Sequence, residues 1–282
     1  RRLSGILKEG IVIEDFNTKF SYTTHDMNFQ DLSLETPYSL IKGQLQFHYK
    51  REDLQYFYDK VDIEATFSPS TLSTTDLRRF YDGFGYGHEL NIKGKATGQI
   101  NNLNFESLDM SGLNTTSLSG NINLTNSFGD DPFHLETKDV NLTSSYDDLI
   151  DLLPTDLKDL LPGYLKDFKS TSLNGKLYLS KEKLQTDLLM ESSLGQASVN
   201  LDFTKYQSPI TATYKGNIDV RNFDLGTMLE IRSIGRGTFN FKVNGSGFTK
   251  KSLNTLAEGE IKSLEINNYT YKDINLKGNL KA

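Results

Sequence analysis

Apolar and polar residues alternate with a period of two in the last quarter of the chain, and this pattern constrains the fold more than any other feature. Between Thr213 and Ala282, the clearest run places Phe239, Phe241 and Val243 at every second position, with polar residues between them. Successive side chains of a β-strand point to opposite faces of the sheet. The alternation therefore predicts strands with one buried face and one solvent-exposed face.

Glycine punctuates this pattern along the whole chain. Asn244-Gly245 and Ser246-Gly247 tolerate positive φ, so they predict a tight hairpin turn after the run just described. Copies of the glycine-containing strand motif recur at irregular spacing, which indicates a degenerate repeat rather than a solenoid of fixed period. The glycines of these copies are Gly43, Gly94, Gly120, Gly175, Gly216, Gly237 and Gly278.

Two segments depart from the strand pattern and predict helical insertions, one near residues 73–82 and one near 146–168. In the first, Ser73 to Thr75 precede Asp76, which is helix-capping chemistry. In the second, leucines recur at three- and four-residue spacing, but Pro154 and Pro162 predict two or three short helices in series. Its apolar face either packs against the sheet or forms a lid over it. Residues 54–58 fit a helix or a strand.

Composition limits how much of the sheet can be buried. Counted with glycine and without tyrosine, apolar residues make up about 39% of the 282 residues, against roughly 45–50% in typical globular chains. We therefore expect one face of the sheet to be buried rather than two. Cysteine is absent, so disulfides and thiolate chemistry are excluded. The formal charge of −6, without a Lys or Arg stripe, argues against nucleic acid or an anionic lipid surface as the main partner.

The number of strand-like runs predicts an all-β fold with about 15–18 strands at ordinary strand lengths. A sheet this wide must curl, split into a sandwich or close into a barrel. We expect a long antiparallel sheet curled into an open, taco-shaped groove with an apolar interior and short helical insertions. Residues 1–282 then form one continuous groove segment, and we expect this segment to be a fragment of a longer chain. So large an apolar face needs a ligand or a lid.

Several motifs, in this order, resemble the TamB branch of the AsmA-like family, the inner-membrane component of the translocation and assembly module. The helical insertions of that family are similar to residues 74–80 and to Leu152-Leu153-Pro154 with Leu161-Pro162. The motifs near the end of the chain are residues 222–229, Ile234-Gly235, residues 243–249 and residues 269–278.

The resemblance implies a bridge-like lipid transport protein of the periplasm. Such a protein is anchored in the inner membrane, carries phospholipid toward the outer membrane for outer-membrane biogenesis, and engages an Omp85-type barrel. We expect the anchor and the barrel-binding region to lie outside residues 1–282. The implied function of this segment is that of a passive conduit.

The residues expected to line the lipid groove are the apolar members of the alternating runs. No residue is expected to be catalytic, and no cofactor or metal is expected. The lining residues are Leu45, Phe47, Ile63, Phe67, Ile122, Leu124, Leu177, Leu179, Ile218, Val220, Phe239, Phe241, Val243, Ile274, Leu276 and Leu280.

Signals for catalysis are weak. The four histidines, at positions 25, 48, 88 and 134, lie far apart in sequence without a paired carboxylate or a second histidine at metal-ligand spacing. The acidic residues between Asp147 and Asp159 lack the spacing of a calcium loop. A structural or adhesive extracellular β-array with a dry closed core is the alternative from a different class. A carbohydrate-active enzyme would need a carboxylate pair in a cleft.

Overall fold

The chain divides into two compact units in the structure, which is a computed structural model. It describes residues 3–6, 10–79, 84–126, 132–152, 163–247, 249 and 251–281. Unit 1 comprises residues 1–135 and 147–161, and unit 2 comprises residues 136–146 and 162–282. The single continuous groove segment predicted for the whole chain stays a prediction.

Unit 1 is built from an open antiparallel sheet in which each strand pairs with the next one in sequence. Its strands are β1 (Leu3–Ile6), β2 (Val12–Tyr22), β3 (Asp26–Glu35), β4 (Leu40–His48), β5 (Asp62–Ser73), β6 (Glu89–Gln99), β7 (Asn102–Gly112) and β8 (Thr116–Thr125).

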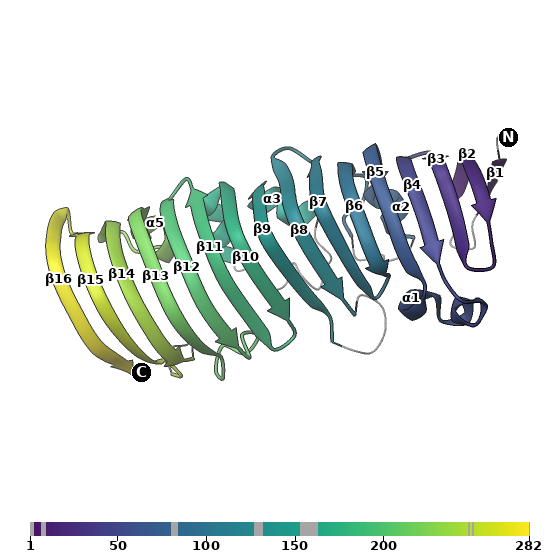
Figure 1. Ribbon diagram of the computed structural model, residues 1–282. Coiled ribbons are helices and arrows are strands. Elements are labelled where there is room, and N and C mark those ends of the chain that lie inside the picture. The colour runs from purple at the N-terminus through teal and green to yellow at the C-terminus, as the bar shows by residue number, and fades with distance from the viewer. Residues whose placement is uncertain are drawn as a thin grey trace. The chain divides into compact units, whose positions relative to one another are not determined.

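Unit 2 repeats this arrangement, and its strands curve along their length (Figure 1). From β10 onward, antiparallel pairing again links each strand to the next. The strands are β9 (His134–Ser145, mostly in unit 2), β10 (Ser170–Ser180), β11 (Lys183–Ser192), β12 (Gly195–Thr204), β13 (Thr213–Asp224), β14 (Ile234–Ser246), β15 (Asn254–Ile266) and β16 (Tyr269–Lys281).

The prediction of an all-β fold with an open antiparallel sheet and short helical insertions is confirmed. The described residues form sixteen strands, within the predicted range. In neither unit do the described residues pair the first strand with the last, so neither sheet closes into a barrel. The closed alternatives considered from the sequence are therefore not adopted.

Short helices interrupt the strand succession at four-strand intervals. The insertion predicted near residues 73–82 contains α2 (Thr74–Leu77), and Ser73 caps it by accepting a hydrogen bond from the Thr75 amide. The insertion predicted near 146–168 contains α3 (Tyr146–Leu152) and the 3₁₀ helix η2 (Gly163–Phe168), while Pro154 and Pro162 lie outside the described residues. A further helix, α5 (Leu225–Leu229), follows β13 and was not predicted.

The segment that fitted either helix or strand is helical. It forms the 3₁₀ helix η1 (Arg51–Tyr56) and the helix α1 (Phe57–Lys60), between β4 and β5. Phe57 packs its ring against Phe47 of β4, with ring centroids 5.4 Å apart. This long-range aromatic contact favours the helical turn, and local propensity does not reveal it.

The hairpin turn predicted at residues 244–247 was placed too early. Asn244, Gly245 and Ser246 belong to β14 and pair with residues of β15. Gly247, with φ of 71°, is the member of this group that adopts positive φ, and the turn follows it. Cross-strand pairing with β15 extends the strand through residues that would favour a turn in isolation.

The recurring glycines lie inside strands rather than at turns, and a neighbouring strand explains why. Gly216 of β13 has φ of 152°, a conformation that L side chains rarely adopt. A Cβ at this position would lie 2.0 Å from the backbone oxygen of Asn200 on β12. The glycine therefore permits a close approach of two strand backbones.

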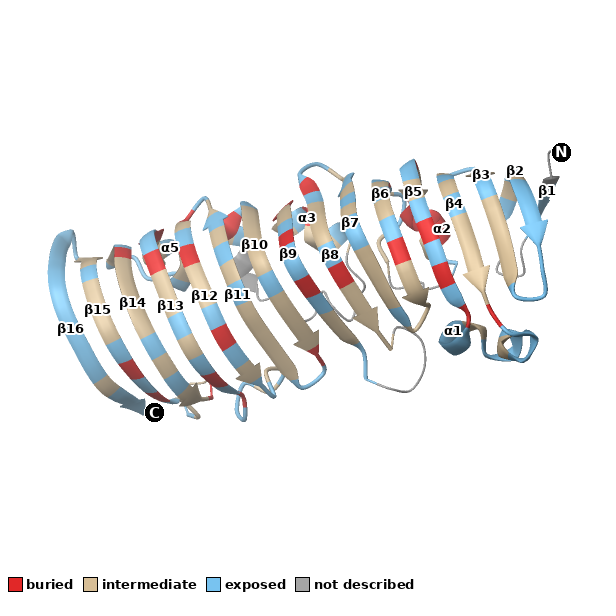
Figure 2. Cartoon of the chain, viewed as in Figure 1, coloured by how far each residue is buried: buried red, intermediate tan, exposed pale blue. Residues whose placement is uncertain are grey.

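Burial is shallow over most of the sheet. Figure 2 shows intermediate burial along most strands and exposure along the length of β16. Two clusters of buried apolar residues form local cores. One, in unit 1, contains Ile63, Ala65 and Ala96. The other, in unit 2, contains Phe168, Leu194, Ala197, Val220 and Phe223.

Candidate functional site: an apolar sheet face

The strand register of unit 2 aligns apolar side chains into four rows that cross seven strands. Residues directly opposite each other on paired strands lie on the same face of the sheet. From β10 to β16, row 1 is Leu173, Met190, Ala197, Val220, Phe239, Ile261, Ile274; row 2 is Gly175, Leu188, Val199, Ile218, Phe241, Gly259, Leu276; row 3 is Leu177, Thr186, Leu201, Gly216, Val243, Ala257, Gly278; and row 4 is Leu179, Leu184, Phe203, Tyr214, Gly245, Thr255, Leu280.

No second sheet covers these rows, because the described strands of unit 2 succeed one another in a single sheet. Row 2 shows the consequence most clearly. None of its residues is buried, and Leu276 on the last strand is 38% exposed. A layer of side chains packed over the face would bury these residues. The centre of the apolar face is therefore open to solvent in the described part of the chain.

One end of the face is closed by a cap formed by Phe168 of η2 with Leu225 and Met228 of α5. Phe168 is 5% exposed, and its ring centroid lies 5.8 Å from that of Phe223. Leu225 and Met228 pack against the same buried cluster, which includes Val220 of row 1. The cap thus covers row 1 and leaves row 2 uncovered.

Hydrogen bonds hold this cap in place. Asp224 caps α5 by accepting a hydrogen bond from the Thr227 amide at 3.0 Å, and this bond lowers the pKa of Asp224. The Ser193 hydroxyl, in the turn between β11 and β12, donates to the carbonyl oxygen of Phe168 at 3.1 Å. Arg236 Nη1 donates to the Leu194 carbonyl in the same turn at 3.2 Å. The cap is therefore anchored to the hairpin beneath it.

The opposite end of the face is finished by tyrosine hydroxyls. Tyr214 of row 4 hydrogen-bonds to the Gly247 carbonyl at 3.3 Å and to the hydroxyl of Thr255. Tyr206, in the β12–β13 loop, donates to the Ser180 carbonyl at 2.9 Å, and burial raises its pKa. These bonds tie the loops at this end to the strands without a helical cap.

The apolar face of unit 1 carries an aromatic ladder. The ring centroids of Phe20 and Phe29 are 5.0 Å apart, those of Phe29 and Phe47 6.1 Å, and α1 adds Phe57 at the end. Edge-to-face and tilted pairs at these separations contribute about 0.5–1.5 kcal/mol each beyond their buried area. Phe20 itself is 56% exposed, so this ladder is open at the β2 side.

The helical insertions of unit 1 are anchored by buried aspartates. Asp76 of α2 accepts hydrogen bonds from the hydroxyls of Thr36 and Ser39, at 2.6 and 2.5 Å, in the turn between β3 and β4. Asp148 of α3 is held in the same way by the β7–β8 turn, with Thr115 as its main partner. Sequence reasoning assigned the acidic residues around Asp148 to a solvated helix face and missed both anchors. Their partners lie 32 to 40 residues away, so no local signal marks them.

All the residues predicted to line a groove lie on these two faces. In unit 1 they share one face through the pairing of β4 to β8, and in unit 2 they occupy rows 1 to 4. Whether they contact lipid stays a prediction. The unit 1 residues are Leu45, Phe47, Ile63, Phe67, Ile122 and Leu124. The unit 2 residues are Leu177, Leu179, Ile218, Val220, Phe239, Phe241, Val243, Ile274, Leu276 and Leu280.

One expectation about histidine was wrong. His48 does have a carboxylate partner, since its Nδ1 lies 2.7 Å from Asp26 Oδ1 across the β3–β4 pair. The hydrogen bond to His48 lowers the pKa of Asp26, and both side chains are more than one-third exposed. The described residues contain no group of three or more His, Asp or Glu placed to hold a metal ion. The pair is a solvent-exposed cross-strand contact.

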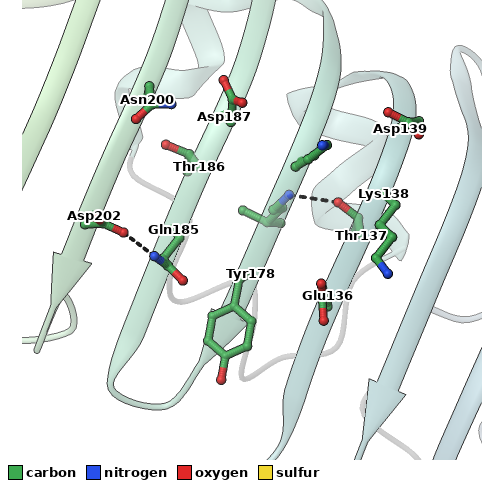
Figure 3. Close-up of a pocket in the computed structure, with 12 residues that line it drawn as sticks. Glu136, Thr137, Lys138, Asp139, Tyr178, Gln185, Thr186, Asp187, Asn200 and Asp202 are labelled. Atoms are coloured by element: carbon green, nitrogen blue, oxygen red, sulfur yellow. Dashed lines mark hydrogen bonds between the residues drawn. The ribbon is translucent and has the colours of Figure 1, made fainter.

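The opposite, polar face of unit 2 carries a shallow depression (Figure 3). Gln185 and Asp202 hydrogen-bond across its floor, and Glu136, Lys138 and Tyr178 surround them. The charged groups of this depression point from an open sheet surface and do not enclose a ligand. The apolar face is the stronger candidate site.

The comparisons with known proteins identify no relative. No protein-family model matches the sequence, and no curated protein or solved structure is similar to it. The resemblance to the TamB branch therefore rests on the sequence motifs. Among the described residues, no helix has the length and apolar character needed to span a membrane.

Proposed function

We propose that this protein binds the acyl chains of lipids on its apolar sheet faces and acts as a passive conduit segment. The observation that carries the proposal is the set of register-matched apolar rows, which continue across seven strands of unit 2 and are uncovered at row 2. An apolar face of this extent requires an occupant in water.

The chemistry of the rows favours an aliphatic occupant over a peptide. Apart from Thr186, Tyr214 and Thr255, the row side chains carry no hydrogen-bonding group. An extended peptide lying flat on them would bury backbone N–H and C=O groups without partners, which is costly. An acyl chain has no such groups. Each methylene buried contributes about 0.8 kcal/mol, so a lipid can be held without a specific headgroup contact.

The wider placement of this activity is proposed from the motif resemblance. We propose that the protein works in the periplasm and that the full-length chain is anchored in the inner membrane. Phospholipid would pass along it toward the outer membrane, where regions outside residues 1–282 would engage an Omp85-type barrel. No residue acts as a catalyst in this mechanism, because lipid moves along the face without a change of covalent bonds.

A matched pair of tryptophan reporters tests the proposal, because the chain contains no tryptophan. Leu188 and Leu189 are neighbours on β11, with Leu188 in row 2 and Leu189 on the opposite face, where it is 59% exposed. Gly175 lies opposite Leu188, which leaves room for an indole ring. Lipids with brominated acyl chains should quench the fluorescence of Leu188→Trp and leave Leu189→Trp largely unaffected.

Equal quenching of the two reporters, or none at either, would contradict the proposal. A second measurement is native mass spectrometry of protein purified without detergent. Bound lipid is expected on the unmodified chain and lost in Phe241→Asp, which places a charge in row 2. Transport that persists in Phe241→Asp, together with no bound lipid on the unmodified chain, would also exclude the mechanism.

The structural or adhesive β-array is less favoured by the same geometry. That alternative requires a dry closed core, whereas row 2 is uncovered among the described residues. It predicts that neither tryptophan reporter responds to lipid.

A further inference from the structure

The turns at the uncapped end of unit 2 gather exposed lysines. Because successive strands run in opposite directions, the β10–β11, β12–β13 and β14–β15 connections lie at the same end of the sheet. Each connection contributes an exposed lysine, namely Lys181, Lys205 and Lys251. In the described residues of these connections, Glu182 is the only acidic side chain. This end therefore carries a local positive charge on a chain whose formal charge is −6.

We infer that these three lysines, called the lysine rim, bind the anionic headgroup of a lipid whose acyl chains lie on the rows beside them. The inference rests on the proposed function and adds to it the class of headgroup and the direction in which the lipid lies. It departs from the sequence-based expectation, which found no basic stripe, because the lysines are 24 and 46 residues apart along the chain.

The cap decides which end of the face receives the headgroup. At the capped end, Phe168, Leu225 and Met228 cover row 1, so a headgroup there would have to displace a packed apolar cluster. At the rim end, Leu179, Leu184 and other members of row 4 are only half-buried. The wet, charged end is therefore the end with lysines.

The dimensions of the face fit this orientation. On β13, Tyr214 of row 4 and Val220 of row 1 are six residues apart, which corresponds to about 20 Å of extended strand. One leaflet of a bilayer has a hydrocarbon thickness of about 15 Å, half of the roughly 30 Å core. Acyl chains of ordinary length that start at the rim therefore end before the cap.

The ion pairs between described residues do not include Lys181, Lys205 or Lys251. Their ammonium groups are available to a phosphate without breaking an internal salt bridge. Exposed charge pairs contribute modestly and are screened by salt. Three such contacts together should favour an anionic lipid about ten-fold over a zwitterionic one at low ionic strength.

The test uses the Leu188→Trp reporter with two probes, brominated phosphatidylglycerol and brominated phosphatidylcholine, each supplied in phosphatidylcholine vesicles. We expect half-maximal quenching at about ten-fold lower concentration of the phosphatidylglycerol. In the triple variant Lys181→Gln, Lys205→Gln and Lys251→Gln, the phosphatidylglycerol curve should move to the phosphatidylcholine curve. The phosphatidylcholine curve itself should not move.

A charge-matched control removes three exposed lysines from the strands instead, with Lys242→Gln, Lys262→Gln and Lys272→Gln. It should keep the preference for phosphatidylglycerol. The inference is overturned if the two lipids quench equally in the reporter protein, if the rim variant keeps the preference, or if the control loses as much of it. Absence of quenching by either lipid would instead overturn the proposed function. The two failures are therefore distinguishable.

Discussion

Replacing Asp148 with alanine is expected to destabilise unit 1 strongly, because the carboxylate is 1% exposed and accepts four hydrogen bonds. The Thr115 amide and hydroxyl donate at 2.7 and 2.8 Å, Asn114 Nδ2 at 3.0 Å and the Thr116 hydroxyl at 3.2 Å. These bonds join α3 to the turn between β7 and β8. Alanine would leave the donors around an empty position that water enters poorly.

The magnitude follows from the number of donors left without a partner. A hydrogen bond to a charged group contributes about 1.5–3 kcal/mol, and an unsatisfied buried donor costs about 1–3 kcal/mol. Because the two hydroxyls can rotate toward other acceptors, we expect a net loss of about 3 kcal/mol. Unit 1 has 150 residues (135 plus 15), so this loss corresponds to a fall in Tm of about 6–12 °C.

Differential scanning calorimetry of the purified protein measures the effect. The matched control is Asp147→Ala, since Asp147 is the adjacent residue of α3 and is exposed. It should change the free energy of unfolding by less than about 1 kcal/mol. A fall in Tm for Asp148→Ala that does not exceed the fall for Asp147→Ala would refute the reasoning.

The effect should also depend on pH. Burial raises the pKa of Asp148, but the hydrogen bonds from Thr115 and Asn114 outweigh it and hold the pKa below 3.8. A carboxylate with a depressed pKa in the folded state contributes stability that is fully present above its unfolded pKa and is lost as the pH falls through the folded value. The difference in Tm between the unmodified chain and Asp148→Ala should therefore be constant near neutral pH and shrink below pH 3.8.

Two further substitutions test the packing of unit 2. Gly216→Ala should cost about 3 kcal/mol or more in chemical denaturation, because its Cβ would lie 2.0 Å from the Asn200 oxygen at φ of 152°. Gly278→Ala, whose Cβ would meet nothing within 4 Å, should be nearly neutral, and equal effects would refute the argument. Phe168→Ala should cost about 3–5 kcal/mol by removing the centre of the cap. Phe20→Ala, at a 56% exposed position, should cost less than about 1 kcal/mol, and a similar loss in both would show that the cap is not a core.

The sequence predicts the faces of the sheet well because the underlying signal is local. The pleat of a strand assigns Phe239, Phe241 and Val243 to one side whatever strand lies next to them. The same rule places all the predicted lining residues on one face of their unit. Strand number and the positions of the insertions after β5 and β9 follow from equally local signals, namely run length and capping residues.

The sequence fails where a partner strand decides the outcome. Asn244 and Gly245 have turn chemistry, but pairing with β15 keeps them in the strand. Asp148 lies in a row of acidic residues that resembles a solvated surface, but a distant hairpin turn buries it. Gly216 has the composition of a turn residue and serves instead to let two backbones approach.

The sequence by itself determined that this protein is an open all-β array with one apolar face, because alternation with a period of two is a property of each strand alone. The tertiary structure decided which end of that face is closed by Phe168 and which end gathers Lys181, Lys205 and Lys251. Both outcomes depend on strand direction and register, which bring together residues far apart in the chain. Pairing energy is shared between strands, so no single stretch of sequence contains it.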